Sequence, residues 1–250
     1  MMAAPRILFL GQKPIGEQCF WKLCETQLPI AGVVTNADSA RGWWKSSEIW
    51  SIAAQKDFAR LDNSRRRHDE LIELIRGSRP DVLVSVQHKW VLPAEILGLV
   101  PRAFNLHLAP LPTYKGYYPF NHVILRREAT FGVVVHHIVP DIDAGPIAYE
   151  EKFAVDSDET AGSLYKKSAD AGVRIFERLL TDLAAGREPP AVPQQGEGRF
   201  YERHEIEPFR EVPSDAAPEE IALRARAFHF PPFPGAFMRA GGQKIFLVPG

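Results

Sequence analysis

The strand around which this chain is organised reads Phe104-Asn105-Leu106-His107-Leu108-Ala109-Pro110-Leu111-Pro112. Side chains alternate between the two faces of an extended strand, so Asn105 and His107 share one face and the apolar residues beside them share the other. The two prolines cannot donate ladder hydrogen bonds, so the strand ends before them and His107 lies near its C-terminal end. In open parallel sheets, ligand crevices form at that end. Taken alone, one histidine in a strand is more typical of a hydrogen-bonded core, so the rest of the chain decides its role.

Composition sets the class of protein. The chain has 250 residues, of which 45% are hydrophobic and 24% charged, as expected for one main globular domain with a small appendage. Lys and Arg total 30 against 31 Asp and Glu, so no positive field is available to hold a polyanion, and we expect no nucleic-acid partner.

The cysteines and the start of the chain indicate a location. Only Cys19 and Cys24 are present, without companions at metal-ligand spacing, which is typical of reduced, buried thiols in an intracellular protein. No apolar run approaches ~18 residues, so we expect neither a signal peptide nor a membrane span. The sequence therefore predicts a cytoplasmic protein that does not bind a membrane.

Strand-like and helix-like segments alternate along the first half of the chain. Apolar runs at 7–11, 30–35 and 81–87 are typical of buried strands, and the segments 15–25 and 67–76 are typical of helices. This alternation predicts an α/β fold with a Rossmann-like, doubly wound and mostly parallel sheet. The segment between residues 36 and 66 is less regular. It holds Trp43 and Trp44, which either stack on a planar ligand or pack over the sheet edge.

The second half adds a hairpin, a long helix and a different tail. Strands at 132–139 and 147–155 are joined by a turn carrying Asp141 and Asp143, and a helix with an apolar stripe then ends at Gly186. Because 10 of the 21 prolines follow Gly186, the tail cannot be one more βαβ layer. We therefore expect a catalytic domain over residues 1–186 and a small Pro-rich α+β appendage over residues 187–250.

Several loops are expected to surround the crevice near His107. The loop at Gln12 and Lys13 matches neither GxGxxG nor a P-loop, so we expect no dinucleotide site there. The loop after the 81–87 strand opens on the same sheet edge, and the aromatic loop with Tyr117 and Tyr118 suits a substrate wall. His136 and His137 point to opposite faces of their strand, so a shared metal is not expected, and we interpret both as structural.

Asn, His and a turn Asp around one crevice can move an acyl group onto an amine. The attacking amine must lose a proton, and imidazole is a base of suitable pKa. The carbonyl oxygen becomes an oxyanion, which the Asn amide can stabilise. A carboxylate beside the imidazolium orients it and raises its pKa.

These motifs resemble the folate-dependent formyltransferase family. The resemblance covers residues 5 to 185 and depends on Asn105-Leu106-His107, the loop Leu111-Pro112-Thr113-Tyr114-Lys115-Gly116, and Ile142-Asp143-Ala144-Gly145. It implies a catalytic set of Asn105, His107 and Asp143, with Asp141 as the near rival for the acid. It also implies 10-formyltetrahydrofolate as formyl donor, without a metal. The donor would be held by the loops carrying Lys89, Trp90, Val91, Leu92, Pro140 and Asp141.

The acceptor is inferred from the length and tail of the chain. Methionyl-tRNA formyltransferases resemble the chain but continue into a sizeable basic C-terminal domain, whereas the short tail around Phe233-Pro234-Gly235 looks most like sugar N-formyltransferases. The resemblance implies a nucleotide-linked amino sugar acceptor, a role in bacterial surface polysaccharide (O-antigen) synthesis, and a homodimer. Candidate sugar-nucleotide contacts are Gln12, Lys13, Lys89, Tyr117 and Tyr118. Two alternatives stay open, namely another amine, such as hydroxyornithine or methionyl-tRNA, and a non-catalytic folate-binding module.

Overall fold

The computed structural model describes residues 3–37 and 48–250. The two interpretations of Trp43 and Trp44 therefore concern residues outside the described part of the chain. In chain order the elements are β1 Ile7–Gly11, α1 Lys13–Cys24, β2 Ile30–Thr35, α2 Glu48–Gln55, β3 Arg60–Asp62, α3 His68–Ser78, β4 Val82–Val86, α4 Ala94–Leu97, β5 Arg102–His107, β6 Lys115–Gly116, α5 Pro119–Leu125, β7 Thr130–His137, β8 Ile147–Ala154, α6 Ala161–Ala184, β9 Phe200–Tyr201, the 3-10 helix η1 Arg203–Phe209, α7 Pro218–Phe228, β10 Phe237–Ala240 and β11 Gln243–Phe246.

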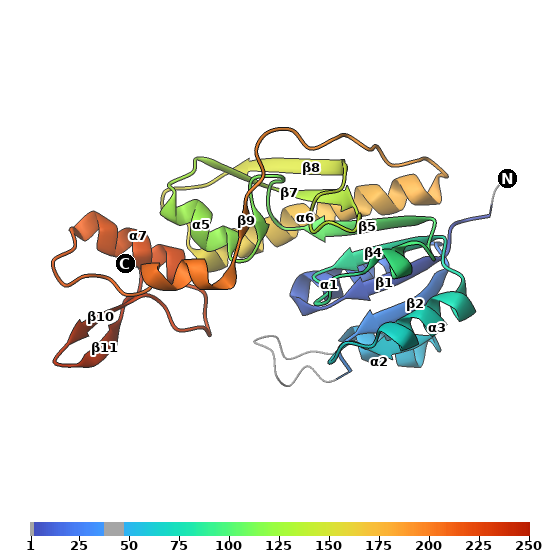
Figure 1. Cartoon of the computed structure of the whole chain (residues 1–250), viewed down its shortest axis with the longest axis horizontal. Coiled ribbons are helices and arrows are strands. Elements are labelled where there is room, and N and C mark those ends of the chain that lie inside the picture. Colours follow the sequence, from blue (N-terminus) through green and yellow to red (C-terminus); the bar gives the residue numbers. More distant parts are fainter. Residues whose placement is uncertain (1–2, 38–47) are drawn as a thin grey trace. The chain divides into compact units, whose positions relative to one another are not determined.

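The main sheet has the strand order β3-β2-β1-β4-β5-β7-β8 (Figure 1). The strands from β3 to β5 in this order are parallel, and β7 pairs antiparallel with β5. The central strands β1 and β4 are buried along their whole length, as expected for strands covered on both faces. This architecture confirms the predicted α/β fold with a doubly wound, mostly parallel sheet.

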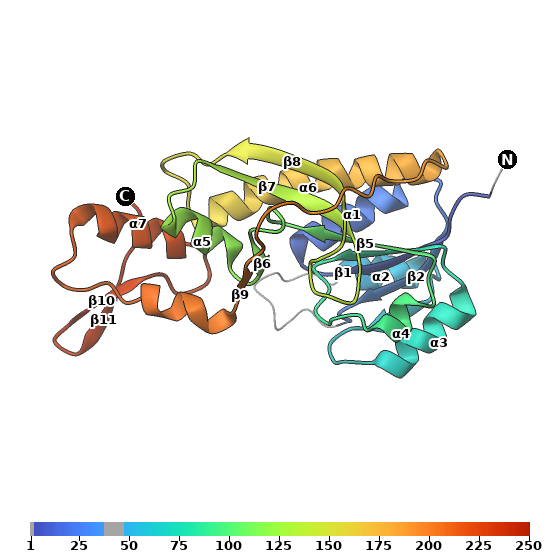
Figure 2. The same ribbon diagram turned by 45° about the horizontal axis from the view of Figure 1, so that its top comes forward.

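Helices cover both faces of the parallel strands. On one face, the ring of Phe9 lies 5.3 Å from that of Phe20 in α1 and 6.3 Å from that of Phe176 in α6. On the other face, Leu8, Leu10 and Leu83 pack with α3 and α4. Figure 2 shows α1 and α6 above the sheet and α3 and α4 below it. Packing of the sheet core therefore fixes the positions of the strand ends, and the polar loops begin at these ends.

The described chain divides into two compact units. Of the described residues, one unit comprises 3–37, 48–107, 134–150 and 172–194, and the other comprises 108–133, 151–171 and 195–250. The second unit has its own apolar core, built on α5 and α7 together with residues of β9 and η1. His122 in this core lies 4.1 Å from the ring of Tyr201, and burial lowers the pKa of His122 to about 4. The domain boundary that was expected after residue 186 stays a prediction.

Five short elements in the described part of the chain were not expected from the sequence. They are α2 and β3 in the irregular segment, β6 in the aromatic loop, and η1 and β10 in the tail. Strands as short as β3, with three residues, and β6, with two, give no alternation that could be recognised. Each is held by a partner distant in sequence, since β3 pairs with β2 and β6 with β9.

Within the described residues, no helix has the length and apolar character needed to cross a membrane.

Replacing Phe9 by Ala is expected to lower the free energy of unfolding by about 3–5 kcal/mol. The Phe9 side chain is fully buried between two aromatic rings, so its loss leaves a cavity. Chemical denaturation measures the change. Val248→Ala is the control, because Val248 is 74% exposed and its truncation should change stability by less than about 0.5 kcal/mol. Equal effects of the two substitutions would contradict this packing.

Candidate active site

Two polar side chains project from the same face of β5. Asn105 and His107 are partly buried, whereas Phe104 and Leu106 on the opposite face are fully buried, as strand alternation requires. In the sheet, Asn105 pairs with Ser85 of β4 on one side and with His136 of β7 on the other. The polar face of β5 is therefore flanked by polar residues from both neighbouring strands.

Asp143 reaches the same place from the turn after β7. One carboxylate oxygen lies 3.7 Å from Nδ1 of His107, and the other lies 3.4 Å from Nε2 of His136. The side chains of His107 and Asp143 are only 13% and 14% exposed, so their interaction is weakly screened by water. The structure thus brings Asn105, His107 and Asp143 together, whereas Asp141 is exposed.

The backbone of this turn is held in an unusual conformation. Asp143 has φ of 50°, in the left-handed region that Asp adopts more readily than most residues. The side-chain amide of Gln194 donates to the carbonyl oxygens of Asp143 (2.9 Å) and Gly145 (2.8 Å). A β-carbon on Gly145 would overlap the carbonyl oxygen of His137, so glycine is needed at this close approach. Gln194 carried no recognisable signal in the sequence, because it lies in the Pro-rich segment assigned to the appendage.

His136 makes contacts beside Asn105 and Asp143 that the sequence did not predict. Its Nε2 lies 3.1 Å from the side-chain nitrogen of Asn105 and faces Asp143, and its Nδ1 lies 2.8 Å from the carbonyl oxygen of His137. His137 is on the other face, with its ring 4.7 Å from that of Phe104. The opposite orientation of the two histidines was therefore predicted, but the contacts of His136 were not, since they depend on the register of β7 against β5.

Gln12 and Lys13 lie at the ends of β1 and β4. The Gln12 side chain is buried and donates to the backbone carbonyl of Gln87, and the Lys13 ammonium donates to the Gln87 side chain at 2.8 Å. Both predicted residues thus link two strand ends at the edge on which β5 also ends.

The Lys89–Leu92 loop is exposed in one part and buried in another. The Lys89 ammonium lies 4.4 Å from the Trp90 ring centre, and Val91 is 54% exposed. Leu92, in contrast, is buried in the core with α3 and α4. In the second loop that is predicted to hold the formyl donor, Pro140 and Asp141 are both exposed.

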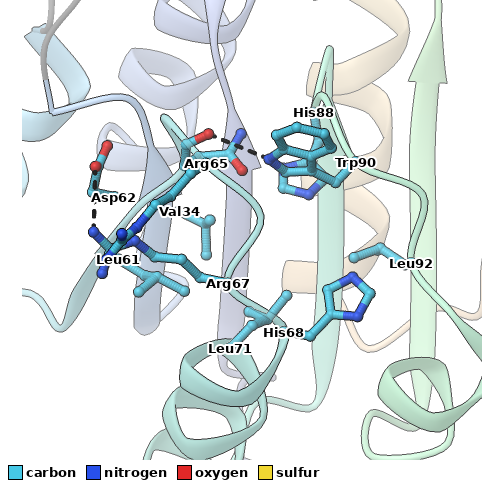
Figure 3. Close-up of a pocket in the computed structure, with 11 residues that line it drawn as sticks. Val34, Leu61, Asp62, Arg65, Arg67, His68, Leu71, His88, Trp90 and Leu92 are labelled. Carbon is cyan, nitrogen blue, oxygen red and sulfur yellow. Dashed lines mark hydrogen bonds and ion pairs between the residues drawn. The ribbon is translucent and has the colours of Figure 1, made fainter.

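A small pocket lies beside this loop, at the ends of β2, β3 and β4 (Figure 3). His88 and Trp90 form one side, and Arg67 stands beside Asp62 on the other (Figure 3). Both ring nitrogens of His88 are buried without a hydrogen-bond partner. Burial, with a smaller effect of His68, lowers the pKa of His88 to about 4.

Tyr117 and Tyr118 belong to the second unit. They are 40% and 39% exposed, and the Arg203 guanidinium lies 4.1 Å from the Tyr117 ring centre. Their predicted role therefore falls on an exposed aromatic and cationic surface of that unit.

Residues 3–37 and 48–250 contain no group of three His, Cys, Asp or Glu side chains that could hold a metal ion.

Acid is expected to destabilise the protein partly through His88. The unfolded chain takes up a proton at the ordinary pKa of 6.5, whereas the folded chain does so only near 4, so stability falls as the pH is lowered through this window. A shift of this size corresponds to at most about 3 kcal/mol. In denaturation curves measured at pH 7 and pH 4.5, His88→Phe should lose less stability than the wild type. His204→Gln, at an exposed position, is the control; identical losses in all three proteins would contradict the assignment.

The chain is similar to known proteins over most of its length. Residues 5–180 match the family described as Formyl transferase. A 4-N formyltransferase from Francisella tularensis is similar in structure, with a TM-score of 0.80 at 18% identity, over 98% of this chain and 97% of that one. A sugar N-formyltransferase from Shewanella is similar with a TM-score of 0.75 at 15% identity, over 98% and 97%.

A third similar structure was solved with ligands. It is an N-formyltransferase from Helicobacter canadensis in complex with folinic acid and dTDP-3-aminofucose, with a TM-score of 0.74 at 20% identity, over 98% of this chain and 86% of that one. At these identities the likeness establishes the fold.

Proposed function

The chain belongs to the formyl transferase family, whose members are folate-dependent enzymes, and on this premise we propose that it transfers a formyl group from 10-formyltetrahydrofolate to the free amine of a nucleotide-linked amino sugar. The observation that carries the proposal is the grouping of His107, Asp143 and Asn105 at the C-terminal end of β5. The sugar acceptor is supported by the sugar N-formyltransferases among the similar structures. We place the reaction in bacterial surface polysaccharide (O-antigen) synthesis.

His107 is the general base of the proposed reaction. Its Nδ1 faces the Asp143 carboxylate, so Nε2 is the nitrogen that takes the proton from the attacking amine. The negative charge of Asp143 stabilises the imidazolium that forms, without itself accepting the proton.

The formyl carbon of the donor passes through a tetrahedral intermediate. A bond forms between the sugar amine and the formyl carbon, the Asn105 amide donates to the resulting oxyanion, and the bond to N10 of the folate then breaks. The proton held by His107 passes to N10, which leaves as tetrahydrofolate. Atoms and charge balance without a metal or a redox step.

The donor and the sugar nucleotide are assigned to loops that share one residue, Lys89. We propose that Lys89, Trp90, Val91 and Leu92, with Pro140 and Asp141, hold the folate. We propose that Gln12, Lys13, Tyr117 and Tyr118 hold the nucleotide sugar and that the Lys89 ammonium contacts it as well. The exposure of Val91 and of both tyrosines leaves apolar surface for such contacts. The proposal includes a cytoplasmic homodimer, as expected from the cysteine content and from the family.

Mass spectrometry after incubation with 10-formyltetrahydrofolate and a mixture of nucleotide-linked amino sugars tests the reaction. We expect a formyl mass increment on one sugar, and a loss of turnover of about 10²–10⁴-fold in His107→Asn and Asp143→Asn. His204→Asn, at an exposed histidine, should match the wild type. Circular dichroism of each variant separates lost catalysis from lost folding.

Other outcomes of this assay redirect the proposal. An increment on hydroxyornithine or on charged initiator tRNA, included in parallel, keeps the chemistry and removes the sugar. Failure of every amine, together with tight tetrahydrofolate binding and no release of tetrahydrofolate from the donor, identifies a folate-binding module instead of an enzyme.

Lys13 and Lys89 are expected to act in binding. Because a hydrogen bond to a charged group contributes about 1.5–3 kcal/mol, Lys13→Ala and Lys89→Ala should each raise the KM for the nucleotide sugar at least about tenfold with little change in kcat. Lys56→Ala, at an exposed lysine after α2, serves as the matched control. An unchanged KM in either variant would remove that lysine from the sugar-nucleotide site.

A further inference from the structure

We infer that Ser85 and His136 are positioning residues that fix the orientation of the Asn105 side-chain amide. The inference rests on the proposed function, in which Asn105 donates to the oxyanion. An amide has a donating and an accepting end, and only the NH2 end stabilises a negative oxygen. Rotation by 180° would present the amide oxygen to the oxyanion and repel it.

The proton of His136 is placed by a backbone group. Its Nδ1 lies 2.8 Å from the carbonyl oxygen of His137, and a carbonyl can only accept, so Nδ1 carries the hydrogen. A neutral imidazole protonated at Nδ1 offers a lone pair at Nε2. His136 is 2% exposed, so water does not compete for that lone pair.

Asn105 is then constrained from both sides. Its side-chain nitrogen lies 3.1 Å from Nε2 of His136 and donates one hydrogen to it. The Ser85 hydroxyl donates to the amide oxygen at 2.8 Å. Both contacts select the same orientation, and they leave the second N–H of Asn105 for the formyl oxygen. The turn glycine, Gly145, packs against the His137 carbonyl that sets this tautomer.

Within residues 3–37 and 48–250, the ionisable groups that face His136 are Asp143 and His107. Asp143 lies 3.4 Å from Nε2, and the His107 and His136 ring centres are 6.5 Å apart. With its hydrogen on Nε2, His136 would donate to Asp143 and could no longer accept from Asn105. The positioning function therefore requires the Nδ1–H tautomer.

Single substitutions give the first part of the test. His136→Leu removes the acceptor at similar volume, and we expect kcat to fall about 10–100-fold with KM for donor and sugar nearly unchanged, by comparison with removal of an oxyanion donor. His136→Gln restores an acceptor near the Nε2 position and should recover most of the activity. Ser85→Ala, which removes the other constraint, should lower kcat about tenfold.

The second part measures whether these residues act through Asn105. In an Asn105→Ala background, adding Ser85→Ala or His136→Leu should leave the residual kcat within about twofold, because no amide remains to be oriented. A residue with a structural role, or one that contacts substrate, would still cost its full factor. Additive losses in the double variants would overturn the inference.

A spectroscopic readout separates this inference from the proposed function. Long-range ¹H–¹⁵N NMR of the histidine rings in the wild-type protein at pH 7.5 should show His136 as the neutral Nδ1–H tautomer, assigned by its absence in His136→Gln. An Nε2–H tautomer or an imidazolium would overturn the inference even in an active enzyme. If no amine is formylated, the proposed function fails, while the tautomer still decides how Asn105 is oriented.

Discussion

The register of three adjacent strands is the constraint on which the site depends. Ser85, Asn105 and His136 occupy paired positions on β4, β5 and β7, so they form one polar row across these three strands. Side chains alternate along a strand, so a slip of one residue in either pairing would turn a member of the row toward the opposite face. The apolar core beneath the strands holds both pairings, and packing thus determines the hydrogen bonds of the site.

The acid reaches this row by different means. Asp143 stands on a turn with a left-handed backbone, and its position comes from hydrogen bonds instead of sheet packing. Gln194 supplies two of them from a segment far along the chain. The site therefore combines a rigid strand that carries Asn105 and His107 with a turn whose carboxylate is held from outside the sheet.

The sequence predicted those site residues whose position depends on a local pattern. Strand alternation and the two following prolines gave the shared face of Asn105 and His107, and the resemblance to a family gave Asp143. The contacts of His136 were not predicted because they require the register of β7 against β5, which no local pattern encodes. Gln194 was missed because it acts from a Pro-rich segment without secondary structure of its own, and β3 was too short to be recognised.

The backbone contacts that hold the Asp143 turn have a consequence for sequence variation. Gln194 binds backbone carbonyls, and Gly145 meets a backbone carbonyl, so the side chains of Ile142 and Ala144 take no part in these contacts. Substitutions at these two positions can therefore alter the shape and charge of the turn's outer surface while the carboxylate of Asp143 stays where it is. Related chains can diverge in what this surface meets and still retain the same acid beside the same imidazole.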